Sequence, residues 1–200
     1  MRTPGVYWIV EAMKILVVGA AGVLGRATLP HLRGHDVVGT TRAESRRDVV
    51  TALGARAEIA DVYVPGAVAR VARAFAPDVV VNFLTDLAGG RGPQNSRIRR
   101  EGGPIVSAAA RACGARRLVV ESVAFDPGVA TSTAAVEALE QDALASGLEA
   151  VVLRFGRLWG PGTWDVAAAE PPAIHVDDAG LRAAALIVDA AARGVHIVAD

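Results

Sequence analysis

Apolar and polar positions along this chain follow two alternating patterns, which predict strands and helices in turn. Short continuous apolar runs predict β-strands at residues 14–18, 35–40, 57–59, 78–83, 117–121, 149–153 and 195–198. Apolar side chains that recur every three or four positions predict helices at residues 23–32, 48–53, 68–75, 105–113, 134–145 and 177–192. A loop rich in glycine and arginine is expected at residues 87–97.

This alternation indicates how the strands are arranged. Strands that are apolar on both sides and are separated by helices are typical of a parallel sheet covered on both faces. Right-handed crossovers then give a doubly wound α/β sheet. The chain of 200 residues suits a single domain of this kind. We expect that domain to span residues 13–200, with residues 1–12 as an N-terminal extension.

Composition narrows the classes of function. The chain is 52% hydrophobic and 21% charged, which is typical of a globular core and not of a disordered segment. Its 21 basic and 21 acidic residues balance, so no net field attracts nucleic acid or an anionic membrane. The single cysteine, Cys113, excludes an internal disulfide and a Cys-x-x-Cys metal site. We therefore expect a cytoplasmic protein that binds a small molecule and no metal. The short segments 125–132 and 163–173 leave the expected cleft exposed, which leaves a homodimer open.

The most informative motif is Gly19-Ala-Ala-Gly22-Val-Leu-Gly25, between the first predicted strand and the first predicted helix. The first glycine allows the tight turn, the second lets a pyrophosphate approach the backbone, and the third lets the helix pack closely against the sheet. The start of the helix then offers N–H groups and a positive dipole end to phosphates. The motif predicts a Rossmann-type site for a dinucleotide on this turn.

The end of the second predicted strand indicates which dinucleotide binds. NAD-preferring sites place an Asp or Glu there for the ribose hydroxyls, but residues 40–42 are Thr, Thr and Arg. Arg42 can pair with a 2′-phosphate and Thr41 can donate a hydrogen bond to it, which favours NADP(H) over NAD(H). The alternative is that Arg42 belongs to a solvated helix start. Asp61, after the third predicted strand, either meets the adenine amino group or caps the next helix.

Several further stretches join the glycine turn in one resemblance. They are Asp61-Val62 and residues 79–83, 117–122, 153–162 and 174–178. Together they resemble the extended and atypical short-chain dehydrogenase/reductase family, the NAD-dependent epimerase/dehydratase group, over residues 13–200. The resemblance implies a nicotinamide near the strand ends at Phe83, Ser122 and Arg154. The expected cofactor contacts are Gly19, Gly22, Val23, Leu24, Gly25, Thr41, Arg42, Asp61, Val62, Phe83 and Arg154.

The chain departs from this family at its catalytic pair. Family enzymes carry a Tyr-x-x-x-Lys pair on the helix after the fifth strand, and the tyrosine is the acid/base. Alignment on Glu140 places Ser132 and Val136 at these positions, and neither side chain can do that chemistry. The two tyrosines of the chain, Tyr7 and Tyr63, lie elsewhere in the sequence. The standard apparatus of the family for hydride transfer is therefore absent.

Two polar residues at strand ends are candidates for the remaining chemistry. The resemblance implies that Ser122 hydrogen-bonds a substrate carbonyl, and the alternative is a strand-end cap. Asp86 is a candidate general base if it is partly buried, and otherwise it caps the start of a loop. The order of the strands predicts that Asp86, Ser122 and Arg154 lie close together.

Other polar residues allow both a functional and a structural interpretation. Arg97, Arg99 and Arg100 either bind an anionic substrate or the cofactor pyrophosphate, or they form a solvated basic face. The resemblance implies that residues 174–178 are structural, with Asp177 as the cap of the last helix and His175 packed and not catalytic.

Three functions fit these features. The first is an atypical short-chain reductase or an epimerase/dehydratase-like enzyme that uses NADP(H) on a small substrate, because segments 125–132 and 163–173 leave a minimal substrate region. The second is a catalytically silent NADP(H)-binding sensor or partner subunit, which the missing pair favours. The third is a non-redox cyclase or isomerase that reuses the cleft. The resemblance includes the strand ends as well as the turn, so we prefer the enzyme.

Overall fold

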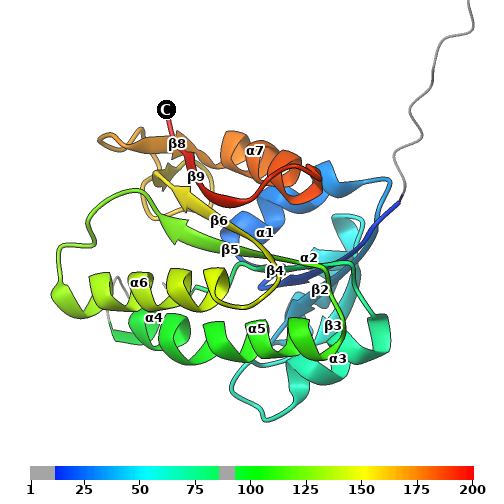
Figure 1. Ribbon diagram of the computed structural model, residues 1–200. Coiled ribbons are helices and arrows are strands. Elements are labelled where there is room, and N and C mark those ends of the chain that lie inside the picture. The colour runs from blue at the N-terminus through cyan, green and yellow to red at the C-terminus, as the bar shows by residue number, and fades with distance from the viewer. Residues whose placement is uncertain (1–11, 86–92) are drawn as a thin grey trace, which may run out of the picture.

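The structure, a computed structural model, describes residues 12–85 and 93–200. Its centre is a parallel sheet with helices on both faces (Figure 1). The strands of this sheet are β1 (Lys14–Val18), β2 (Asp36–Thr41), β3 (Arg56–Ile59), β4 (Val79–Asn82), β5 (Arg117–Val123), β6 (Glu149–Phe155) and β9 (Gly194–Val198). They lie in the order β3-β2-β1-β4-β5-β6-β9, and all neighbouring pairs are parallel. The predicted doubly wound α/β sheet is confirmed, whereas the extension predicted at residues 1–12 lies outside the described residues except for residue 12.

Two sets of helices cover the sheet. One face carries α1 (Val23–Thr28), α2 (Arg47–Ala52) and α7 (Val176–Val188), and the other carries α3 (Ala67–Phe75), α5 (Gly103–Ala112) and α6 (Ala130–Leu144). A shorter helix, α4 (Pro93–Arg97), lies beside α6. In the described part of the chain, no helix combines the length and the apolar character needed to cross a membrane.

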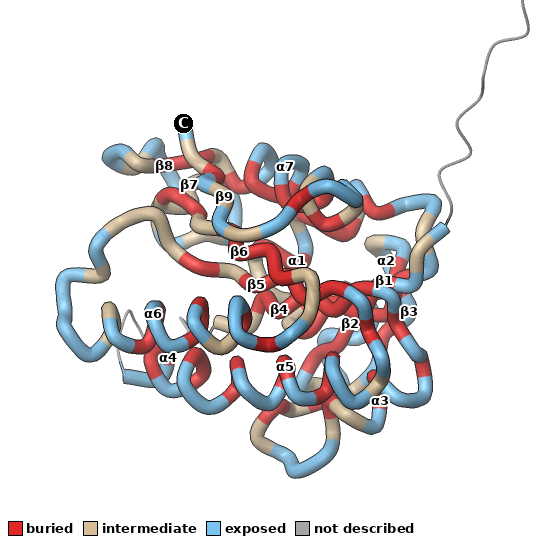
Figure 2. Tube along the Cα trace, viewed as in Figure 1, coloured by how far each residue is buried: buried red, intermediate tan, exposed pale blue. Residues whose placement is uncertain are grey.

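The middle strands are buried from both sides, which explains their continuous apolar runs. Ile15 and Val17 of β1 belong to the apolar cluster on the α1–α7 face, whereas Leu16 and Val18 belong to the cluster on the α3–α5 face. All residues of β4 are buried, and Figure 2 shows the middle of the sheet mostly in red. The sheet is thus stabilised by apolar burial on both faces.

Helices α1 and α7 touch through a glycine. A Cβ atom at Gly180 of α7 would lie 2.3 Å from the carbonyl oxygen of Ala27 in α1, so no side chain fits there. Both helices contribute to the same apolar cluster, with Leu24 from α1 and Ile187 from α7. The last helix therefore completes the cover around the first.

Some elements differ from the sequence pattern for local reasons. The helix predicted at residues 23–32 ends at Thr28 and continues as a 3-10 turn, Leu29–Leu32, which contains Pro30. Part of the predicted loop at residues 87–97 is helix α4, which runs through a π-helical turn, Ile98–Gly102, into α5. Two further strands, β7 (Arg157–Trp159) and β8 (Ala173–His175), pair in parallel and are too short to produce a periodic pattern.

The cap of the last helix is His175. Its Nδ1 atom accepts a hydrogen bond of 3.3 Å from the backbone N–H of Asp177. The prediction that Asp177 caps α7 is therefore wrong. The ring of His175 also meets the ring of Trp159 edge-on, with 4.6 Å between the centroids. His175 thus packs, as expected, and in addition caps the helix.

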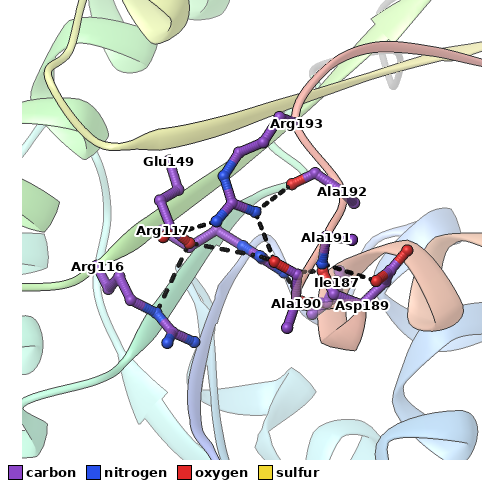
Figure 3. Close-up of polar contacts among 9 residues, drawn as sticks. All are labelled: Arg116, Arg117, Glu149, Ile187, Asp189, Ala190, Ala191, Ala192 and Arg193. Carbon is purple, nitrogen blue, oxygen red and sulfur yellow. Dashed lines mark hydrogen bonds and ion pairs between the residues drawn. The ribbon is translucent and has the colours of Figure 1, made fainter.

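A buried arginine ties the end of α7 to the start of β5. The Arg117 side chain is fully buried, and Nη1 donates to the carbonyls of Ile187 and Asp189 at 3.1 and 2.6 Å. Nη2 donates to the carbonyl of Ala190 at 3.2 Å and to Glu149 at 3.4 Å (Figure 3). Carbonyls at a helix C-terminus lack partners within the helix. The guanidinium therefore caps α7 and fixes it to the amino edge of the sheet.

Two further arginines contact Glu149, the first residue of β6 (Figure 3). One carboxylate oxygen lies 2.7 Å from Nη2 of Arg193, and the other lies 3.7 Å from Nε of Arg116. The side chain of Arg116 is half exposed, and among the described residues its ion pair is this long contact with Glu149. The side chain of its neighbour Arg117 is buried. The two adjacent arginines therefore differ in burial while they share one carboxylate.

We expect Arg117→Met to lower the free energy of unfolding by about 3 kcal/mol, because it leaves several buried acceptors without a donor. Urea denaturation measures this change. Arg116→Met is the matched control and should change the free energy by about 0.5 kcal/mol or less, as for an exposed ion pair. Equal losses in the two variants would contradict the role given to Arg117.

Candidate active site

A cavity of about 800 Å³ opens at the carboxyl ends of the parallel strands. Ligands of open α/β sheets bind at this edge, and the volume is in the usual range for sites of small molecules and cofactors. Residues that end or follow successive strands line the cavity, among them Gly19, Thr41, Asp61, Phe83, Ser122 and Phe155. Of the expected cofactor contacts, all except Gly25 and Arg154 are in its lining.

Steric contacts explain two glycines of the turn. Gly19 has a φ of +90°, and a Cβ atom there would lie 2.7 Å from the carbonyl oxygen of Phe83. A Cβ atom at Gly25 would lie 2.4 Å from the carbonyl oxygen of Ala20. Gly19 therefore allows the turn beside the end of β4. Gly25 lets α1 pack on that turn, which explains why it is absent from the cavity wall.

The end of β2 presents basic side chains to the cavity. Thr41 is buried and lines it, and its Oγ1 accepts a long hydrogen bond of 3.4 Å from the backbone N–H two residues later. Arg42 and Arg46 line the cavity next to it. The first carboxylate after Thr41 is Glu44, which forms an ion pair of 3.2 Å with Arg47. This corner therefore presents a hydroxyl and two guanidinium groups to the cavity.

The end of β3 contributes Asp61 and Tyr63 to the same cavity. The Asp61 carboxylate accepts a hydrogen bond of 2.9 Å from the backbone N–H of Tyr63. The N-cap of the next helix, α3, is Gly66, so the alternative that Asp61 caps this helix is wrong. Tyr63 also lines the cavity, although it is distant in sequence from α6, the helix on which the family carries its tyrosine. The centroid of its ring lies 4.4 Å from Cζ of Arg97.

Ser122 and Arg154 meet at a buried glutamate. They are partners in the register of β5 and β6, so their predicted proximity is confirmed, whereas Asp86 lies outside the described residues. The Ser122 hydroxyl, 0% exposed, donates to Glu140 Oε1 at 2.5 Å. Arg154 donates from Nε and Nη2 to the two oxygens of Glu140 at 2.9 and 2.6 Å. The network joins two neighbouring strands to α6.

The charge of Glu140 is held in place by these donors. Burial alone would raise the pKa of Glu140, but the hydrogen bonds from Arg154 and Ser122 outweigh it and hold that pKa below its ordinary value. The proton of Ser122 and two donors of Arg154 are thus directed to this carboxylate. The expected roles of Ser122 toward a substrate carbonyl and of Arg154 toward the cofactor stay predictions.

The positions of the family's catalytic pair hold no acid/base group. Ser132 lies in the first turn of α6 and lines the cavity, where its Oγ is 3.2 Å from Oγ of Ser96. Val136, one turn later, is buried in the protein. A serine hydroxyl is too weak an acid to replace tyrosine, and valine carries no charge that could lower its pKa.

One of the three neighbouring arginines turns into the cavity. Arg97 is exposed and donates from Nε to Glu101 at 2.8 Å, and Arg100 is exposed as well. Arg99 is buried in the π-helical turn and lines the cavity. The interpretation of all three as a solvated basic face therefore fails at Arg99. The sequence could not separate them because the π-helical turn changes which side chains face inward.

Arg99 lies near a glutamate that the sequence pattern did not identify. Glu121, near the end of β5, lines the cavity next to Ser122. Burial raises the pKa of Glu121 to about 7, and the charge of Arg99 opposes this only in part. Burial likewise lowers the pKa of Arg99, against the attraction of Glu121 and Glu140. A glutamate inside a run of valines was a sequence signal that could have marked this site.

Comparisons with known proteins identify relatives of this chain. A family model described as the NAD dependent epimerase/dehydratase family matches residues 15–124. A Streptomyces protein named 3-diazoavenalumate denitrifying reductase is 34% identical over 236 aligned positions, which cover 94% of this chain and 76% of that protein. The chain is thus similar to a reductase along nearly its whole length.

Solved structures share the fold. The Bordetella bronchiseptica enzyme WbmH, in complex with NAD+, has a TM-score of 0.77 and 19% identity over 94% of this chain and 75% of its own. The Thermus thermophilus UDP-glucose 4-epimerase, in complex with NAD, has a TM-score of 0.76 and 19% identity over 94% of this chain and 78% of its own. At this level of identity the likeness is one of fold.

We expect Glu121→Gln to make stability less dependent on pH. With its pKa raised to about 7, Glu121 contributes stability that is complete below the ordinary value of 4.5 and is lost as the pH rises through 7. At about pH 8 the free energy of unfolding of the variant should therefore exceed that of the parent by about 2 kcal/mol. Near pH 4 the two proteins should be equally stable.

Denaturation in urea at both pH values tests this expectation. The exposed Glu137 of α6 provides the control, because Glu137→Gln should change stability little at either pH. A Glu121→Gln variant that follows the parent at both pH values would show that this carboxyl group does not titrate in the way described.

Proposed function

The chain belongs to the NAD dependent epimerase/dehydratase family, and from this premise we propose that it is an NADPH-dependent reductase whose reaction needs no tyrosine acid. One observation carries the proposal: Ser132 and Val136 stand where the family's Tyr and Lys would be, while the glycine turn is complete. Reduction of a carbonyl requires a proton for the oxygen. The proton donor that the family uses for this step is missing from α6, so we favour a substrate that loses a leaving group to hydride.

The relative from Streptomyces supports this class of reaction. Its name describes a reductase that removes nitrogen from a diazo compound. NADPH supplies the hydride that forms the new C–H bond, and the electron pair of the broken C–N bond leaves with N2, so no proton is needed. We extend this reaction class, the replacement of a diazonium group by hydrogen, to the present chain.

The residues of the cavity fit a bound NADPH. Gly19 makes the tight turn beside the backbone of Phe83, and Gly22, which lines the cavity, would let a pyrophosphate approach the backbone. Arg42 and Arg46 would hold the 2′-phosphate at the end of β2. Asp61 would face the adenine end of the site.

Aromatic and apolar side chains form the wall on the substrate side. Phe125 and Pro127, after β5, and Phe155, at the end of β6, line the cavity together with Trp164. Such a wall holds an aromatic ring and keeps water from the reacting carbon, so that hydride is not lost to side reactions. The chain would thus contribute binding, orientation and exclusion of water, and it would leave the redox chemistry to the cofactor.

We expect NADPH to bind more tightly than NADH, with Arg42→Ala weakening NADPH about tenfold or more and leaving NADH unchanged. Titration followed by nicotinamide fluorescence measures both affinities. Arg47→Ala is the matched control, since Arg47 pairs with Glu44 and does not line the cavity. Equal affinities for the two cofactors would contradict the NADPH preference. If neither cofactor bound, the glycine turn would not be a dinucleotide site and the proposal would be wrong.

We expect the protein to oxidise NADPH in the presence of 4-carboxybenzenediazonium and to release benzoate and N2. Cofactor deuterated at the transferred position should place deuterium on the ring carbon, which mass spectrometry of the benzoate detects. The same mixture without protein corrects for direct reduction. Faster turnover of 4-formylbenzoate, an aldehyde of similar size, would instead indicate a carbonyl reductase and would contradict the proposal.

A further inference from the structure

Arg99 is a buried arginine without a partner in the cavity wall. It is 6% exposed and lines the cavity. With the residues that the structure describes, its guanidinium forms no hydrogen bond or ion pair, and it feels Glu121 and Glu140 only through space. Arg117, the other buried arginine of this part of the chain, donates four hydrogen bonds. The fold therefore supplies hydrogen-bond acceptors to Arg117, whereas the described residues supply none to Arg99.

An unpartnered guanidinium in this place needs a ligand. It carries five N–H donors in a fixed planar arrangement and stays charged even when buried. Leaving such a group desolvated and unpaired is strongly unfavourable. Since no described residue supplies the acceptor, an anion in the cavity can supply it.

We infer that Arg99 binds the carboxylate of a small, apolar acid, which is the substrate of the reaction proposed above. A carboxylate matches the guanidinium with two parallel hydrogen bonds. The inference rests on the proposed function for the identity of the acid as a substrate, while the anion site itself rests on the burial and the lining position of Arg99. The apolar body of the acid would lie against Phe125 and Phe155, which line the same cavity.

The charges around Arg99 favour a monoanion over a phosphate. Its electrostatic neighbours are Glu121 of β5 and Glu140 of α6, and both are acidic. A doubly charged phosphate group would be repelled by these carboxylates more strongly than a carboxylate would. The glycine turn, which suits the cofactor pyrophosphate, follows β1, and β4 lies between β1 and β5 in the sheet. Arg99 therefore belongs to the substrate part of the cavity.

Glu121 makes the site depend on pH. When its carboxyl group holds a proton, Arg99 faces the cavity with less competition for its charge, and an anion binds more tightly. Loss of that proton above about pH 7 places a second negative charge near the ligand. Among the described residues, Glu140, which pairs with Arg154, also acts on Arg99, and Arg157 and Asp165 are further charged residues of the cavity lining.

Calorimetric titration with benzoate and with benzamide, its neutral analogue, tests the anion site without any turnover. At about pH 6 we expect the protein to bind benzoate about tenfold or more tightly than benzamide. Arg99→Gln should remove this preference, and Arg99→Lys should keep part of it. Arg100→Gln, on the exposed neighbour, is the matched control and should keep all of it. The NADPH affinity of Arg99→Gln should equal that of the parent.

A second variant tests the pH dependence. Benzoate should bind the parent about fivefold or more weakly at about pH 8 than at about pH 6, and Glu121→Gln should abolish this difference. Since that substitution removes a charge and keeps the shape of the side chain, it does not depend on how Arg99 variants fold. A benzoate affinity that falls with pH equally in both proteins would overturn the role of Glu121.

The remaining outcomes separate this inference from the proposed function. Equal binding of benzoate and benzamide by the parent overturns the anion site. Loss of NADPH affinity in Arg99→Gln also overturns it, because Arg99 would then contact the cofactor phosphates. Benzoate binding that depends on Arg99, in a protein that does not oxidise NADPH with the diazonium acid, supports the anion site and rejects the reductase.

Discussion

The covered parallel sheet decides where this protein can place a charge. Helices bury both faces, so a charged side chain within a strand is tolerated only near one of its ends. Strand β5 carries one at each end, Arg117 at the amino edge and Glu121 near the carboxyl edge. Arg117 donates four hydrogen bonds to carbonyls and a carboxylate and holds α7 in place. Glu121 lines the cavity and has no such partner among the described residues. The partnered charge at the amino edge therefore stabilises the fold, and the unpartnered charge near the carboxyl edge faces the cavity.

Local patterns predicted most of the fold, because apolar runs and the helical period are properties of neighbouring residues. The glycine turn was predictable for the same reason, since its steric demands act over a few positions. The burial of Arg99 was not, because it depends on the π-helical turn that carries it. The partner of Ser122 was not predictable either, because Glu140 reaches it only after α6 packs beside β5. The sequence therefore predicted the lining residues that follow β1, β2 and β3 better than the contacts among residues at the ends of β5 and β6.

The cavity end formed by β5 and α6 also differs most from the family pattern. There is no tyrosine or lysine on α6, and the polar groups that line this end include Ser122, Glu121, Arg99 and Ser132, whose hydroxyl contacts Ser96. Glu140 and Arg154 neutralise each other and brace this end. The arrangement is suited to recognising a charged ligand and to keeping a reaction centre dry. The tyrosine of the family pattern is missing from α6, and the proposed loss of a leaving group is a reaction that needs no proton donor in its place.

The contact of Gly180 with Ala27 joins two helices that leave the ribosome at very different times. Helix α1, which begins at that turn, emerges early, but the helix that covers it emerges about 150 residues later. Until α7 is made, a nascent chain exposes the apolar side of α1 around Leu24. Helix α1 can acquire its final packing only when the last helix docks. Completion of the cover over α1 is therefore a late event for each new chain, although the glycine turn that begins this helix is translated early.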